Sequence, residues 1–236
     1  MIRFHHLLFG LFTSCAPIVY APNIQHIPEL TEAGDISILA GYGGSGTDFF
    51  DLSAAYAVSS QYAVMLSGNY GREGNFNFDT YYGEGIYIEP AFGYYNADHA
   101  NMRYSLYGAF GSGRQRHFIA TGDRVMIDWN RFYLQPGITF KNGRASFTFS
   151  SRLGHMRFGD GLSRLQSYNP EIESINNIRP NSGILFAEPA VTIAYGWEQL
   201  KLNVQLSRLF VNEFNYPFHE YYLGLGLSYT ISTIKK

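Results

Sequence analysis

Hydrophobic and polar residues alternate with a period of two along most of the chain, from about residue 35 to residue 230. Around residue 52, for example, Phe50 and Leu52 fall on one side of an extended chain, and Asp51 and Ser53 fall on the other. This alternation is typical of a β-strand with two different faces. Because it recurs with turn residues between the stretches, the pattern predicts an all-β chain.

The connections between the predicted strands are alternately short and long. Asn142-Gly143 is a strong hairpin signal, and Ser59-Ser60-Gln61 also reads as a tight turn, whereas the longest connection covers residues 159–182. In that connection we expect a short helical turn near residues 170–178. The alternation predicts ten strands, with eight as the alternative, near residues 36–42, 50–58, 62–70, 88–94, 102–110, 134–140, 146–153, 187–193, 200–207 and 221–230.

One heptapeptide pattern occurs three times, at residues 88–94, 134–140 and 187–193. Each copy reads apolar, Glu or Gln, Pro, small, apolar, small, apolar. Proline cannot donate a hydrogen bond to a sheet ladder and is normally confined to edges and bulges. Its recurrence in the same place on three strands therefore predicts a repeated β-bulge, with coincidence as the alternative.

The composition favours a membrane protein that crosses the bilayer with strands. Only 15% of the residues are charged, while Tyr and Phe occur 19 times each and Gly 25 times. No stretch approaches the ~18 apolar residues that a membrane helix needs. Such a chain fits a transmembrane β-barrel, because alternation dilutes the hydropathy of its strands. A secreted soluble β-sandwich is the competing class. The net charge of −2 disfavours a nucleic-acid partner.

The strand pattern closes consistently as a single antiparallel barrel of residues 35–234. An even strand count, short turns at one end and longer loops at the other are typical of outer-membrane barrels. Aromatic residues also gather near the predicted strand ends, as they do at the two interfaces of a bilayer. Those expected near the short turns are Tyr62, Tyr94, Phe140, Trp197 and Tyr229, and those expected near the longer loops are Tyr70, Phe110, Phe132 and Tyr221.

The N-terminus predicts export. A weakly basic start with Arg3 is followed by a short apolar run, residues 7–12, which reads as a secretory signal peptide covering residues 1–14. The signal ends at Phe12-Thr13-Ser14-Cys15, which holds the single cysteine of the chain. This tetrapeptide is similar to a bacterial lipobox and predicts lipid attachment at Cys15. An ordinary signal peptide with an incidental cysteine is the alternative.

The chain resembles the small outer-membrane β-barrel lipoproteins of Gram-negative bacteria. The resemblance rests on residues 12–15, on the proline-bearing Tyr20-Ala21-Pro22-Asn23 and on the hairpin at residues 56–65, and it covers nearly the whole chain. Many such barrels end on an aromatic residue, whereas this chain continues to Ile234-Lys235-Lys236.

The resemblance also implies how the N-terminus would be placed. Cys15 is followed by Ala16 and by no acidic run, which suits an anchor in the periplasmic leaflet of the outer membrane. We therefore expect residues 15–34 to form an extended, lipid-anchored periplasmic tether, with the C-terminal tail on the same side.

Five residues are expected to form a polar network inside the barrel. By alternation Glu89, Gln135 and Glu188 point inward beside the three prolines, and turn positions bring Arg131 and Arg152 close to them. Charges inside a barrel pair with one another because unpaired burial is costly. We expect this network to fill the lumen, since ten strands enclose little more space than eight. A selectivity ring in a narrow pore is the alternative.

Catalysis is not indicated by the sequence. Proteases and lipid-modifying enzymes of the outer membrane place Asp, His and Ser near the outer rim. Here that rim would hold His117, Asp123, Asp128, His155, Asp160 and Ser163, without the spacing that nucleophilic or acid–base chemistry requires. Neither a Cys/His cluster nor a glycine-rich loop before a helix suggests a metal or cofactor.

The expected function is therefore a non-catalytic one. We expect a structural, assembly-partner or surface-binding role, with recognition through residues 111–123 and 159–182, because exposed loops commonly carry it. The expected partners are outer-membrane lipids and other outer-membrane or periplasmic proteins. A pore and an outer-membrane enzyme are the alternative functions.

Overall fold

A computed structural model describes residues 20–44, 48–74, 81–97, 101–119, 124–159, 178, 182–212 and 218–232. Within those ranges no helix combines the length and the hydropathy of a membrane span. The strands are β1 (Ile36–Gly44), β2 (Asp48–Ala57), β3 (Tyr62–Gly74), β4 (Tyr81–Asn96), β5 (Met102–Ile119), β6 (Arg124–Asn142), β7 (Ala145–Phe158), β8 (Gly183–Gly196), β9 (Leu200–Arg208), β10 (Phe210–Val211) and β11 (Tyr221–Ile231).

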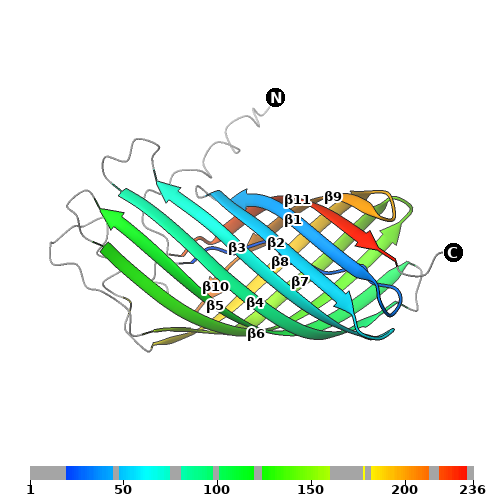
Figure 1. Ribbon diagram of the computed structural model, residues 1–236, viewed down its shortest axis with the longest axis horizontal. Helices are drawn as coiled ribbons and strands as arrows, with labels where there is room; N and C mark the ends of the chain where they lie inside the picture. The colour runs from blue at the N-terminus through cyan, green and yellow to red at the C-terminus, as the bar shows by residue number, and fades with distance from the viewer. Residues whose placement is uncertain are drawn as a thin grey trace, which may run out of the picture.

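The strands form one closed antiparallel sheet (Figure 1). Closure comes from β1, which pairs with β2 on one side and with β11 on the other. β9 and β10 both pair with β8 in a single register, Ala190 with Ser207 and Ala187 with Phe210, so they are one strand interrupted at Leu209. The prediction of an all-β, ten-stranded barrel is therefore confirmed.

The two ends of the barrel differ in their connections. At what we call the turn end, neighbouring strands are joined by residues 58–61, 97–101, 143–144 and 197–199. At the opposite, loop end they are joined by residues 45–47, 75–80, 120–123, 159–182 and 212–220. The loop end lies at the left of Figure 1, and the C-terminus lies at the turn end. The predicted helical turn near residues 170–178 lies almost wholly outside the described residues.

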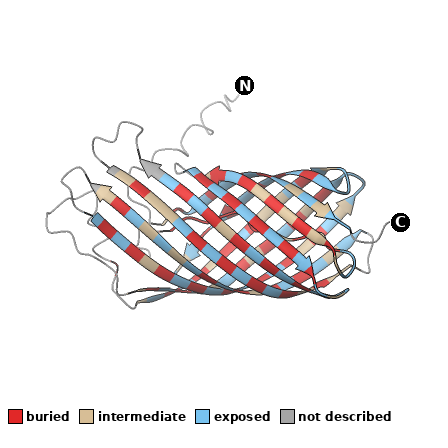
Figure 2. Cartoon of the chain, in the orientation of Figure 1, coloured by how far each residue is buried: buried red, intermediate tan, exposed pale blue. Residues whose placement is uncertain are grey.

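Along each strand buried and exposed side chains alternate, as the banding in Figure 2 shows. In β2, Leu52 points outward and is 52% exposed, whereas Asp51 points into the lumen and is 3% exposed. The outward set is apolar and the inward set is polar, which is the reverse of a soluble protein. A closed sheet leaves no unpaired edge, so an apolar outer face of this kind suits a bilayer.

This polarity inverts near the loop end of the longest strands. In β6, Val125, Ile127 and Trp129 point inward and are buried, while Asp128 and Asn130 point outward. From residue 131 to the turn end the same strand carries polar residues inside and apolar residues outside. Such an inversion is expected where the wall of a membrane barrel leaves the hydrocarbon and meets water.

Outward-facing aromatic residues border the apolar zone at both ends. At the turn end Tyr94 contacts Tyr62 and Tyr104, with ring centroids 5.8 and 6.2 Å apart. Such rings are typical of the girdles at bilayer interfaces. The exposed aromatic residues of the turn end include Tyr62, Tyr104, Phe140, Tyr195, Trp197 and Tyr229, and those nearer the loop end include Tyr70, Phe110, Phe132 and Tyr221.

The three repeated prolines do not lie at bulges. On either side of Pro136 the pairs Leu134 with Leu153 and Gly137 with Ser150 keep one register, and the same continuity holds at Pro90 and Pro189. The bulge prediction is wrong, since a bulge adds a residue and shifts the ladder. Each proline points outward. Ladder pairing is missing only for the proline and the residue before it, and only with the strand that follows in the chain.

Candidate functional site

The N-terminal segment, residues 20–34, lies inside the barrel from Tyr20 to Leu30, and residues 31–34 lead out at the turn end to β1. Ile24, Gln25 and His26 are each less than 5% exposed, and their partners are inward-facing side chains of the wall. The prediction of an extended conformation holds, since the prolines at 22 and 28 restrict the residues before them. The prediction of a periplasmic tether is wrong for residues 20–30, because they lie in the lumen with their polar groups bonded to the wall. Residues 1–19, with the predicted signal peptide and Cys15, lie outside the described residues.

Gln25 shows how the wall satisfies this segment. The Gln25 N–H donates to the Gln205 side chain at 2.8 Å, and the Gln205 amide donates back to the Gln25 carbonyl at 3.1 Å. The Gln25 side chain donates to the Glu188 carbonyl at 2.6 Å and accepts from Ser150 at 2.8 Å. Buried polar groups need such partners, so the segment is seated specifically and does not merely occupy space.

Arg131 forms the first half of a charged layer in the middle of the lumen. Its Nε donates to Glu89, its Nη1 lies 3.5 Å from Glu188, and its Nη2 donates to Asn23 at 3.2 Å. The guanidinium also lies 4.9 Å from the centre of the Tyr20 ring. Contacts with an aromatic face stabilise a desolvated cation. Further rings within 6.0 Å of this guanidinium belong to Tyr87, Trp129, Tyr133 and Phe186.

Arg152 completes the layer. Its Nε donates to Gln135 at 2.8 Å, its Nη1 donates to Asn23 and lies 3.4 Å from Glu188, and its Nη2 donates to the Ile24 carbonyl at 3.3 Å. The side chains of both arginines and both glutamates are at most 1% exposed. The structure thus brings together all five residues expected in the lumen.

Two members of the layer were not foreseen from the sequence. Tyr20 donates its hydroxyl to Glu188, and Asn23 accepts from both arginines. Both belong to the motif Tyr20-Ala21-Pro22-Asn23, whose proline predicts an extended tether and does not indicate a position in the lumen. A usable signal was the glycine content of the inward face of β1: a Cβ added to Gly41 would lie 2.2 Å from Ile24 Cδ1. A wall without side chains there leaves room for a second chain inside.

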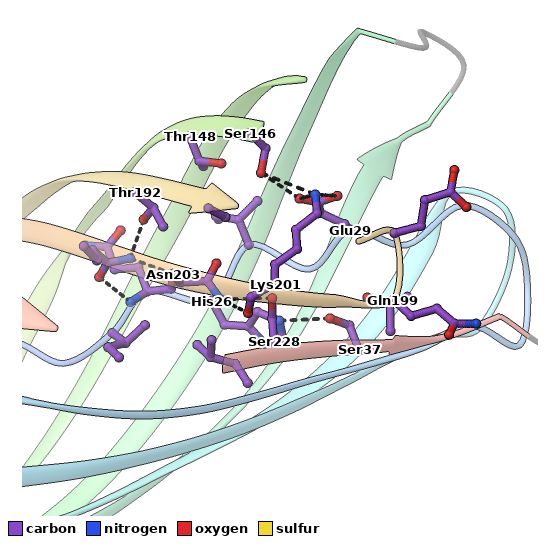
Figure 3. A pocket seen from close by; sticks show the side chains of 18 residues that line it. His26, Glu29, Ser37, Ser146, Thr148, Thr192, Gln199, Lys201, Asn203 and Ser228 are labelled. Atoms are coloured by element: carbon purple, nitrogen blue, oxygen red, sulfur yellow. Dashed lines mark hydrogen bonds and ion pairs between the residues drawn. The ribbon is translucent and has the colours of Figure 1, made fainter. Parts of the chain in front are cut away.

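A small polar cavity lies on the turn-end side of the charged layer, and Figure 3 shows the side chains that line it. Glu29 accepts from Lys201 at 2.7 and 2.8 Å and from Ser146 at 3.0 Å, and it also pairs with Lys141. The cavity measures about 40 Å³. A single water needs roughly 10–15 Å³ on this measure, so the cavity has room for a few waters and is too small for a metabolite.

The loop end of the lumen is filled by apolar side chains. Tyr20 contacts Trp129 edge to face, with ring centroids 5.5 Å apart, and Phe218 at 6.3 Å. Phe218 in turn stacks on Phe158 at 6.3 Å. Met156 and other buried side chains extend the same cluster. The described lumen is therefore occupied along its length: apolar at the loop end, charged in the middle and polar at the turn end.

Of the rim residues considered for catalysis, the three that the structure describes do not converge. His117 points into the barrel and is buried, whereas His155 points outward on β7. Asp128 is outward and pairs with Arg114 at 2.6 Å. Asp123, Asp160 and Ser163 lie outside the described residues. Among the residues that the structure describes, no group of three or more His, Cys, Asp or Glu side chains could hold a metal ion.

Comparison with known proteins finds likeness in structure only. No family model and no curated protein matches the chain. The N-terminal β-barrel domain of Pseudomonas aeruginosa OprF is similar over 85% of this chain and all of that one, at 14% identity and a TM-score of 0.36. Ail, the attachment invasion locus protein of Yersinia pestis, is similar over 84% of this chain and 99% of its own, at 14% identity and a TM-score of 0.39. The Escherichia coli outer-membrane protease OmpT is similar over 84% of this chain and 95% of its own, at 12% identity and a TM-score of 0.41. At these values no functional argument rests on them.

Proposed function

We propose that this protein is a non-catalytic outer-membrane β-barrel whose lumen is closed by its own N-terminal segment. The observation that carries the proposal is the seating of residues 20–30 among buried, hydrogen-bonded wall residues. A closed lumen favours a structural, scaffolding or surface-binding role over transport. Its partners are then the surrounding lipids and other proteins of the outer membrane or periplasm.

The membrane location is supported by the outer wall. Leu202, Leu225 and Phe132 are examples of large apolar side chains that are more than half exposed in a continuous band. Exposed apolar surface on that scale is unusual for a soluble monomer, and a bilayer removes it from water. Fractionation with the outer membrane and heat-modifiable mobility on detergent gels are the expected results. Recovery as a soluble periplasmic monomer would contradict the location.

Planar-bilayer conductance tests the closed lumen. The refolded protein should show no stable channels, because the lumen is occupied from the apolar cluster to the Glu29 ion pairs. A variant lacking residues 20–33 is the matched comparison, and where it keeps heat-modifiable mobility it should conduct. Channels of equal conductance in both proteins would refute the plug and favour the narrow-pore alternative.

Lipid attachment at Cys15 remains a prediction of this proposal. Cys15→Ser should abolish lipid labelling and yet leave the protein in the membrane, because the apolar wall holds it there independently. Unchanged labelling would contradict the lipobox interpretation. Wholesale release from the membrane would instead contradict the barrel location.

Catalysis at the loop-end rim is the alternative function. It predicts hydrolysis of a peptide or phospholipid that is lost in His155→Ala or Asp128→Asn. We expect no turnover in the native protein, since these side chains lie on the outer face of the wall, away from the buried His117.

A further inference from the structure

The N-terminal segment crosses the barrel in one direction. Tyr20 packs on Trp129 near the loop end of β6, and Glu29 pairs with Lys141 at the turn end of the same strand. The contacts between these two points follow in order along β6, Asn23 with Arg131 and His26 with Gln135. The segment therefore runs the length of the lumen and does not fold back within it.

The lengths agree with a complete crossing. From Tyr20 to Glu29 the chain advances nine residues, which reach at most ~30 Å when extended. From Trp129 to Lys141 the wall advances twelve residues, or ~40 Å, which a tilt of roughly 35–45° reduces to ~30 Å along the axis. The hydrocarbon core of a bilayer is also ~30 Å thick. The segment thus spans the membrane almost straight.

Both ends of the segment are fixed to opposite ends of the barrel. At the turn end the Gly34 N–H donates to Ala57 at 2.8 Å, just before β1 begins. At the loop end Tyr20 forms a bridge with Phe218, and the His219 N–H donates to the Tyr20 carbonyl at 3.1 Å. Tyr20 is therefore attached to the connection between β10 and β11, on the side of the long loops.

We infer that the chain passes through its own barrel and presents the residues before Tyr20 on the cell surface. The inference rests on the proposed outer-membrane location, in which the long loops face outward. It gives the barrel a function beyond closure, because the wall then holds the point at which the chain enters the lumen, Tyr20, at the extracellular end.

The inference also places any lipid on Cys15. Cys15 lies five positions before Tyr20, a stretch that reaches at most ~18 Å, whereas return to the periplasmic leaflet requires crossing ~30 Å of hydrocarbon. The lumen is already occupied by residues 20–30. Acyl chains on Cys15 would therefore enter the outer leaflet, contrary to the periplasmic anchor expected from the sequence.

Cysteine labelling of intact cells with a membrane-impermeant maleimide tests the inference, with the native Cys15 retained. Ile18→Cys reports the segment before Tyr20. Arg116→Cys, exposed near the loop end of β5, is the extracellular control, and Ser60→Cys, in the turn between β2 and β3, is the periplasmic control. The unsubstituted protein gives the background from Cys15. Heat-modifiable mobility confirms that each variant is folded.

We expect Ile18→Cys to label on intact cells as fully as Arg116→Cys, and Ser60→Cys to label only after permeabilisation. If Arg116→Cys labels on intact cells and Ile18→Cys does not, the threading inference is overturned and the proposed location stands. If Ser60→Cys labels on intact cells, or Arg116→Cys requires permeabilisation, the proposed location and orientation fail instead.

Discussion

The two parts of β6 show how one strand meets two different environments. From Arg124 to Asn130 its inward residues are apolar and its outward residues are mainly polar or charged, as in a soluble protein. From Arg131 to Asn142 the arrangement is reversed, and the interior holds arginine, tyrosine, glutamine and threonine. Neither the period of two nor the register of the ladder changes between them.

The difference teaches that the surroundings decide which face carries which chemistry. Where the outer face meets lipid, the apolar residues are outside and the interior has to hold polar groups that satisfy one another. The N-terminal segment supplies the missing partners there, for example the Asn23 oxygen shared by two arginines. Where the wall is surrounded by water, an ordinary apolar cluster fills the interior.

The largest effect is expected from a pair of arginine variants, one in the lumen of the membrane region and one on the outer face of the wall near the loop end. Arg152→Met should cost ~3–5 kcal/mol, because Glu188 and Asn23 lose a buried donor. Arg114→Met removes a bidentate pair with Asp128, at 2.6 and 3.0 Å, whose side chains are 47% and 38% exposed. That change should cost at most ~1 kcal/mol. Denaturant unfolding in lipid vesicles measures both, and equal costs would contradict a specifically paired lumen.

A second pair of variants tests the outer face. Leu225→Lys introduces a charge near the middle of β11, on the lipid-facing side, and should destabilise the fold by ~2–4 kcal/mol. Met126→Lys makes a similar change on the outward face of β6 beyond the polarity inversion, and surface substitutions there should stay within ~0.5 kcal/mol. Comparable losses for the two variants in vesicle unfolding would show that the inversion does not mark the bilayer boundary.

A third pair probes the seating of the segment. Gly41→Ala adds a Cβ that would lie 2.2 Å from Ile24 Cδ1, so the wall or the segment must shift. Such overpacking should cost ~1–3 kcal/mol. Gly68→Ala, on the outward face, meets nothing closer than 3.5 Å and should be nearly neutral. Adding Ile24→Ala should recover part of the loss in Gly41→Ala. Without any such coupling, the segment would not occupy this position in the lumen.

The smallest expected effect concerns the repeated proline. Pro136→Ala supplies an N–H on the side where pairing with β7 lapses, and in an unshifted register it can restore a ladder bond worth ~0.5–1.5 kcal/mol. Losing the stiff proline costs ~0.4–1 kcal/mol through the unfolded chain. The net change should stay within ~1 kcal/mol, and Pro90→Ala and Pro189→Ala should behave alike. A loss as large as that of Leu225→Lys would point to a working role for the neighbouring charged layer.

Most of the wall was predictable because its signals are local. Alternation assigned Phe50 and Leu52 to the outer face and Asp51 and Ser53 to the lumen, as the structure has them. The turn signals also predicted the strand order: with β9 and β10 counted as one strand, every strand pairs with its neighbours in the chain, and β1 pairs with β11 to close the sheet. The proline bulge failed because a missing donor can be absorbed as a gap in the ladder, without any added residue.

The sequence by itself therefore determined the faces, the number and the order of the strands, because each stretch separately shows the alternation of hydrophobic and polar residues with a period of two. Only the tertiary structure decided that residues 20–30 lie within the barrel. Their partners are remote, such as Gln205 for Gln25, 180 residues away. An extended polar segment with two prolines has no hydrophobic period, so its sequence does not distinguish a position in water from a position in a polar lumen. What distinguishes the two is the set of buried donors and acceptors that the closed wall presents to it.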